Sequence, residues 1–268
     1  MKYWSTIRLF AWFMPLLAMT ATACVQVQTD FKAIPPGPWR GILKLESNRI
    51  SANPKGQPLP EKLNLSFEEV TAGELPFNFE VVYENDTTFY FNIQNAGEQL
   101  RTPPIEFGRT RQRAKDTLRV SFEGVQAYLT AFYEENLLEG LWVVGGPEGY
   151  RVPFVAYYGQ NHRFTTLRKP VSADLSGQWI IQLQTDSAAI SGTASFTQQG
   201  NDLKAAFTLD GRALPALEGT VQADKAYLSR FDGANALLLE AKIRPDGSLI
   251  GSFRSGLYEK RIWEARRQ

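Results

Sequence analysis

The sequence predicts an all-β protein made of two tandem antiparallel up-and-down β-barrels. Short runs of alternating apolar and polar residues, separated by Gly, Pro, Asn and Asp, fill most of the 268 residues, and no window has a sustained helical period. A stretch near the middle of the chain also recurs near its end, as expected of a duplicated domain. The recurrence has a constant offset of 109: Phe122, Gly124, Ala127 and Leu129 correspond to Phe231, Gly233, Ala236 and Leu238.

The first predicted barrel spans residues 36–167. Residues 47–61 are rich in Ser, Asn, Pro and Gly and are expected to form an exposed loop after the first strand. Three glycines and a proline in 145–149 predict a turn, because they cannot continue a hydrogen-bonded ladder. The predicted strands are 37–45, 63–70, 76–83, 88–94, 98–107, 117–123, 126–133, 138–144 and 150–157.

The second predicted barrel spans residues 174–268, after a connection at 165–173. Its loops are short, and Gln199-Gly200, Asp210-Gly211 and Asp246-Gly247 supply hairpin turns at strand junctions. Consecutive antiparallel strands of this kind leave two free sheet edges, which closure into a barrel removes. The predicted strands are 178–184, 190–198, 202–209, 216–222, 225–231, 234–243, 248–254 and 258–266.

The N-terminus reads as an export signal. Lys2 and Arg8 precede an apolar run at 9–19 that is too short to span a bilayer, and small residues follow it. Ala21-Thr-Ala-Cys24 resembles the lipobox of bacterial lipoproteins. That resemblance implies a signal peptide at 1–23, acylation of Cys24 and a lipidated tether at 24–35. The alternative is an ordinary signal peptide cleaved after Ala23, which leaves Cys24 as a free thiol.

Lipidation implies a membrane partner and a place in the cell envelope. Several acyl chains on Cys24 would make anchoring effectively permanent. Val25 follows the cysteine in place of the Asp that can retain lipoproteins in the inner membrane, so the outer membrane facing the periplasm is the expected location. Cys24 is the only cysteine, so the chain is expected to have no internal disulfide and no dithiol of its own.

Each repeat opens with a Gly-x-Trp triplet and ends with basic residues. This pattern resembles lipocalin-type barrels, in which an arginine near the end of the chain covers a first-strand tryptophan. The physical expectation is a guanidinium stacked on an indole at one end of the barrel. We therefore predict barrel-closing roles for Trp39 and Arg163 in the first repeat, and for Trp179 with Arg261 and Arg266 in the second.

The mature chain also resembles the N-terminal region of TlpA/ResA-type thiol–disulfide oxidoreductase lipoproteins of Gram-negative bacteria. The resemblance covers residues 36–268, and its motifs include Gly37-Pro-Trp-Arg40, 74–80 and 151–156 in the first repeat and 174–179, 231–236 and 246–253 in the second. In that family a thioredoxin domain with Cys-x-x-Cys follows where this sequence ends at Gln268. The resemblance therefore implies location and architecture, while the redox activity carries over to no residue of this sequence.

The residues offer little catalytic chemistry. His162 is the only histidine, lies in a polar stretch and is expected to be a solvated loop residue, so a Ser-His-Asp triad and the usual zinc sites are not expected. Glu123 and Asp232 occupy equivalent repeat positions before Gly, which turn capping explains. Acidic and basic residues nearly balance, at 28 and 29, so no nucleic-acid surface is expected. We predict no enzyme activity, no metal and no cofactor.

Three Asp-Ser/Thr triplets, at 86–88, 116–118 and 186–188, resemble acceptors for O-glycosylation of exported proteins in some Gram-negative bacteria. This resemblance predicts modification at Thr87, Thr117 and Ser187.

Three functions remain open. The first is a non-catalytic docking module related to thiol–disulfide oxidoreductases, with a separately encoded thioredoxin-like protein as partner. The second is a carrier of a small apolar ligand inside one barrel, against the favoured alternative that aromatic side chains fill that interior. The third is a truncated or split oxidoreductase whose catalytic part is encoded downstream.

Overall fold

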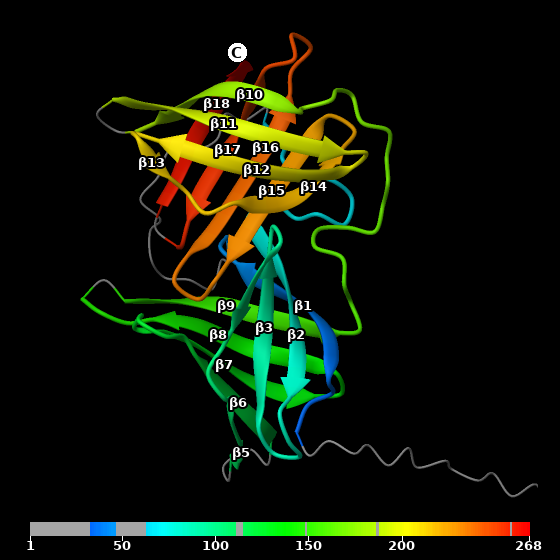
Figure 1. Cartoon of the computed structure of the whole chain (residues 1–268), viewed down its shortest axis with the longest axis vertical. Coiled ribbons are helices and arrows are strands. Elements are labelled where there is room, and N and C mark those ends of the chain that lie inside the picture. The colour runs from blue at the N-terminus through cyan, green and yellow to red at the C-terminus, as the bar shows by residue number, and fades with distance from the viewer. Residues whose placement is uncertain (1–32, 47–62, 111–114, 148, 186–187, 258) are drawn as a thin grey trace, which may run out of the picture. The chain divides into compact units, whose positions relative to one another are not determined.

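The computed structural model describes residues 33–46, 63–110, 115–147, 149–185, 188–257 and 259–268 (Figure 1). All of them belong to one compact unit, Phe31–Gln268. The described residues form strands and turns without any helix, so none of them lies in a helix that could cross a bilayer. The all-β prediction is confirmed. The predicted signal peptide, Cys24 and most of the tether lie outside the described residues.

The first half forms one antiparallel nine-stranded sheet in the order β4-β3-β2-β1-β9-β8-β7-β6-β5. The sheet curls but stays open, because β4 and β5 do not pair with each other in the described part of the chain (Figure 1). Its strands are β1 (Gly37–Lys44), β2 (Glu74–Tyr83), β3 (Phe89–Asn95), β4 (Glu98–Arg101), β5 (Glu106–Thr110), β6 (Lys115–Ser121), β7 (Ala127–Glu134), β8 (Leu137–Val144) and β9 (Tyr150–Tyr158).

The second half is a closed barrel. Eight strands follow the order β11-β10-β18-β17-β16-β15-β14-β12, and pairing of β11 with β12 closes the ring, with the short β13 attached to β12. Its strands are β10 (Gly177–Gln184), β11 (Ala189–Gln199), β12 (Asp202–Leu209), β13 (Arg212–Ala213), β14 (Leu217–Gln222), β15 (Lys225–Phe231), β16 (Ala236–Ile243), β17 (Leu249–Ser255) and β18 (Glu259–Arg267).

Two predicted strands of the first half differ from the structure. Residues 67–70 form a tight turn, closed by backbone hydrogen bonds of 2.9 and 2.7 Å between Phe67 and Val70, where a strand over 63–70 was expected. The predicted strand 98–107 is divided into β4 and β5 by Pro103 and Pro104, which have no N–H for a ladder. Thr102 and Ile105 still donate to β3, whereas β5 pairs with β6, so the segment bends from one edge of the sheet to the other.

The core of the first half includes side chains of the second half. Alternate residues of β15 and β16 point out of the barrel and join the aromatic cluster of the first sheet; these are Tyr227, Phe231, Ala236 and Leu238, together with Leu257 after β17. The barrel has its own separate core, centred on Trp179, Phe207 and Trp263. The closed barrel is therefore self-contained, while the open sheet is completed by the outer surface of its neighbour.

Candidate functional site

The two Gly-x-Trp motifs have the same local structure. Trp39 and Trp179 are both buried, and each indole Nε1 donates to the carbonyl oxygen four residues earlier, at 3.1 Å to Pro35 and 2.8 Å to Leu175. In each motif the glycine has a positive φ, 107° at Gly37 and 122° at Gly177. The repeated triplet thus marks a repeated way of starting a β domain.

The arginine that covers Trp179 is Arg267, whose Cζ lies 5.2 Å from the ring centroid. The assignment to Arg261 and Arg266 is corrected by strand register, because Arg267 pairs directly with Trp179 whereas Arg266 pairs with Ile180. Arg261 pairs with Phe253 on the other neighbouring strand, and its Nε donates to Glu259 at 2.7 Å.

In the first half the corresponding tryptophan is covered by aromatic rings. The centroid of Trp39 lies 6.1 Å from that of Phe79, 6.4 Å from Tyr133 and 5.3 Å from Tyr158. The described contacts of Arg163 are with other residues, so its predicted barrel-closing role over Trp39 is wrong.

Arg163 instead joins the first sheet to the barrel. Its side chain is 8% exposed, forms an ion pair with Glu218 and donates to Gln94 O at 2.7 Å and to Ser229 Oγ at 3.3 Å. Burial lowers the pKa of Arg163, and the carboxylate of Glu218 opposes that shift. The partners come from both halves, so Arg163 fixes one against the other.

An aromatic cluster lies at the same junction. The ring centroid of Phe231 lies 4.4 Å from that of Phe77 and 5.4 Å from that of Trp142. Trp142 Nε1 donates to Gly233 O at 3.2 Å. Asn95, almost fully buried, accepts from the N–H of Phe231 and donates to its carbonyl. The contacts are directional as well as apolar, which favours a single fixed arrangement.

A buried carboxylate completes the junction. Glu240 is 1% exposed and accepts from Gly73 N and from Ser252 Oγ, both at 3.0 Å. The buried Arg254 lies beside it, with Nε 3.9 Å from Glu240 and Nη2 2.8 Å from Glu46, although neither nitrogen has hydrogen-bond alignment with a described partner. Burial raises the pKa of Glu240, against the hydrogen bond from Gly73 and the charge of Arg254.

The other residues singled out from the sequence are scattered. His162 is half-buried at the end of the first sheet, and its pKa is lowered by burial and then by Arg40. Asp232 caps its turn, with Oδ1 accepting from Ala234 N and Asn235 N, as predicted. Within the described residues, no three His, Cys, Asp or Glu side chains are grouped to hold a metal ion.

The predicted glycosylation acceptors differ in exposure. Thr87 is exposed in the turn between β2 and β3, whereas the Thr117 hydroxyl donates to Gly108 O within the sheet, at 3.0 Å. Ser187, like Cys24, lies outside the described residues.

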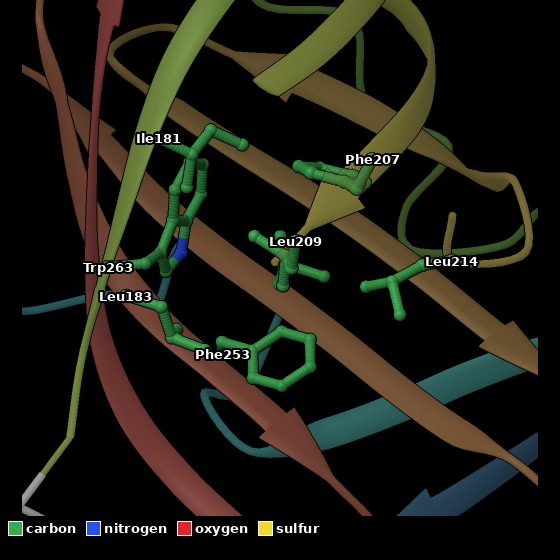
Figure 2. A pocket seen from close by; sticks show the side chains of 8 residues that line it. Ile181, Leu183, Phe207, Leu209, Leu214, Phe253 and Trp263 are labelled. Carbon is green, nitrogen blue, oxygen red and sulfur yellow. The ribbon is translucent and has the colours of Figure 1, made fainter. Parts of the chain in front are cut away.

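An apolar cavity enters the barrel between β10, β12, β17 and β18. Figure 2 shows Ile181, Leu183, Phe207, Leu209, Leu214, Phe253 and Trp263 around it, and Leu239 completes the lining. Its volume is about 10 Å³, roughly the space of one water molecule, and its lining is wholly apolar. Side chains thus fill most of this part of the interior.

The outer face of β7, β8 and β9 carries a group of half-buried apolar side chains, which we call the outer patch. Its members are Tyr128, Phe132, Leu141, Val143, Pro153 and Val155. Trp142, Leu138 and Phe154 belong to the buried core. Successive side chains of a strand point to opposite faces, so the members of the outer patch, which lie at the positions between them, face away from the core. Register places four of the members in adjacent pairs, since Leu141 pairs with Pro153 and Val143 with Tyr128, whereas the exposed Glu139 lies between Phe132 and Val155 and pairs with both.

The outer patch differs from the equivalent face of the barrel. There the outward positions are mainly Gln, Thr, Ser and Lys, including Gln182, Thr193 and Lys204, as is usual for a sheet that faces water on one side. A sequence signal for the patch exists: residues 141–144, Leu-Trp-Val-Val, are apolar in both phases of the strand. That signal is compatible with a strand whose two faces are both apolar, and it could have predicted the patch.

Comparison with known proteins gives no relative, because no family model, curated protein or solved structure matches this chain.

Proposed function

We propose that this protein is a non-catalytic docking module of the cell envelope, which holds a protein partner on the outer patch. The outer patch is the single observation that carries the proposal. Apolar side chains gathered on the outside of a sheet are a common mark of interaction sites, because a partner that covers their exposed part removes apolar surface from water.

The fixed junction between the two halves supports the same proposal. Arg163, Glu240 and the Phe231 cluster hold the open sheet against the barrel. A surface on such a pre-organised body loses little conformational entropy when it binds. The barrel would then serve as a support that keeps the β7–β9 face in one shape.

Two further parts of the proposal rest on the resemblances of the sequence. Acylation of Cys24 would place the module at the periplasmic side of the outer membrane. The TlpA/ResA-type resemblance makes a separately encoded thioredoxin-like protein the expected partner, with the module supplying position and the partner supplying the dithiol.

Photo-crosslinking in native envelopes tests the docking face. A photoreactive amino acid at Leu141 should give a crosslinked protein identifiable by mass spectrometry, and the same residue at Thr193 on the barrel is the control. A thioredoxin-like protein crosslinked at Leu141 alone supports the whole proposal. A different protein crosslinked at Leu141 alone would support docking on the outer patch and contradict the thioredoxin-like partner. The same crosslinked products at Leu141 and at Thr193 would contradict docking.

The second candidate function is binding of a small apolar ligand, which the apolar lining of the barrel cavity supports (Figure 2). A cavity of about 10 Å³ would have to widen by movement of its side chains to admit such a ligand. Trp263 lines that cavity, so its fluorescence should report entry of a lipophilic probe. A saturable change that Leu214→Arg abolishes would support this candidate, and a linear or absent change would count against it.

A further inference from the structure

A hollow of about 240 Å³, lined mainly by polar residues, lies where the free edge of β4 approaches the turn that follows β15. It is separate from the outer patch. Its walls come from Asn95, Glu98, Gln99 and Leu100 of the first sheet and from Arg230, Asp232, Ala234 and Asn235 of the barrel. Drug-sized ligands fill pockets of about 300–1000 Å³, so an occupant of this hollow would be small.

The base of the hollow is held rigidly. The side chain of Arg230 is nine-tenths buried; its Nε donates to Asp232 at 3.2 Å, Nη1 to Ala216 O at 3.2 Å and Nη2 to Glu98 Oε2 at 2.8 Å. Asn95 is held by both of its bonds to the Phe231 backbone. A ligand would therefore meet polar groups that are already ordered, which reduces the entropic cost of binding.

Several of these groups have unused hydrogen-bonding capacity. A guanidinium has five N–H donors, and the described bonds of Arg230 use three of them. The described bonds of Asn235 at its side chain all use Nδ2, which leaves Oδ1 as an acceptor, and only Oε2 of Glu98 is engaged with described residues. The residues that line the hollow thus carry both donors and acceptors that the described bonds leave unused.

The charges of the hollow define the class of ligand. Arg230 neutralises only one of the two carboxylates beside it, Glu98 and Asp232, so the three side chains carry a net charge of −1, which disfavours an anion. A cation gains little in return, because Asp232 already accepts from Arg230, Ala234 N and Asn235 N, and Glu98 is 62% exposed, so that water screens its charge. A hydroxyl group both donates and accepts and carries no charge, which suits this mixed lining. Leu100 and Ala234 offer apolar contact for C–H groups. We propose that the hollow binds a neutral, hydroxyl-rich molecule of monosaccharide size.

Ligand-observed NMR on the full chain tests this. The probes are methyl glucoside and N-acetylglucosamine as neutral hydroxylated compounds, lysine as a cation and inorganic phosphate as an anion. Saturable binding of at least one neutral probe in the millimolar range is expected, without binding of lysine or phosphate. Preference for a charged probe, or no saturable binding by either neutral probe, would overturn the proposal.

Two variants locate the binding. Leu100 is 39% exposed, so Leu100→Arg should fill the hollow without disturbing the fold and weaken binding at least tenfold. Thr193→Arg, on an exposed face of the barrel, should leave binding unchanged. Equal binding by the Leu100→Arg and Thr193→Arg variants would place the ligand elsewhere and refute the site.

Discussion

Phe231 packs edge-on against Phe122, its counterpart in the other repeat, with ring centroids 5.7 Å apart and an interplanar angle of 89°. Edge-to-face geometry is a favourable arrangement for two aromatic rings. The duplicated motif thus does more than recur in the sequence, because its two copies meet and form part of the junction between the halves. The environments of the two copies nevertheless differ, and that difference makes the junction testable.

Gly233→Ala should destabilise the protein strongly. A methyl group there would lie 2.1 Å from the ring of Phe122, and the φ of +87° is itself unfavourable for alanine. Gly124, the equivalent glycine, has a φ of +72° and open space around its Cα. We expect Gly124→Ala to cost about 1–2 kcal/mol, from backbone strain alone, and Gly233→Ala to cost about 3–5 kcal/mol, because overpacking adds to it. Urea unfolding of the two variants measures the difference. Equal losses of unfolding free energy would show that Phe122 can move away from the added methyl group without cost, which would contradict a tightly packed junction.

The two halves should differ when they are separated. A fragment of residues 168–268 contains the whole closed barrel and should retain β-sheet circular dichroism and cooperative unfolding. A fragment of residues 33–167 lacks the five side chains that complete its core, including Tyr227 and Phe231, and should remain unfolded or bind hydrophobic dyes. Restored native fluorescence when the two are mixed would support the dependence, whereas cooperative unfolding of the first fragment alone would contradict it.

Much of the fold could be predicted because its signals are local. Hairpin turns such as Asp246-Gly247 and the alternation in β10 and β12 each arise within a few residues, and the duplicated Gly-x-Trp motif marks both domain starts. Pro103 and Pro104 also carried a local signal against a continuous strand, but the predicted strand 98–107 ran through them. The turn at 67–70 was also missed. Its two central residues are the adjacent Glu68 and Glu69, which carry no strong turn signal and were included in the predicted strand 63–70.

The contacts that join the two halves could not be predicted. Arg163 was assigned to Trp39 because it ends the repeat, yet its partners Gln94, Ser229 and Glu218 come from distant parts of the sequence. Similarly, Arg266 and Arg267 are indistinguishable until strand register is known, since one step in register reverses the face of a side chain. Alternation gives the inward face of a strand, but whether its outward face meets water or another domain depends on tertiary structure.

The corrected arginine assignment predicts unequal effects of two neighbouring substitutions. Arg267→Ala should destabilise the protein by about 1–2 kcal/mol, because it removes the cation–π contact with Trp179 and hydrogen bonds to Ser176 O and Asp174 O. Arg266→Ala should change stability by less than about 0.5 kcal/mol, as for an ordinary surface substitution. Thermal unfolding compares them, with tryptophan fluorescence as a second readout, and a larger effect at Arg266 would refute the assignment.

The buried carboxylate of Glu240 should make stability fall as pH rises. Burial raises the pKa of Glu240, so its contribution is fully present below the ordinary glutamate pKa of about 4.3 and is lost as pH increases through the raised value. Glu240→Gln can still accept from Gly73 N and carries no charge. Relative to wild type, this variant should therefore gain stability between acid and neutral pH, whatever its absolute stability.

Glu46→Gln provides a control of opposite sign in the same network. Burial raises the pKa of Glu46, but its ion pairs with Lys260 and Arg254 outweigh burial and lower the pKa overall. That carboxylate stabilises the fold above its ordinary pKa, and the contribution is lost as pH falls through the depressed value. Glu46→Gln should therefore be less stable than wild type at neutral pH, with the gap closing in acid. Urea unfolding across pH 3–8 distinguishes the two, and parallel pH profiles for both variants would mean that Glu240 does not remain protonated above the ordinary range.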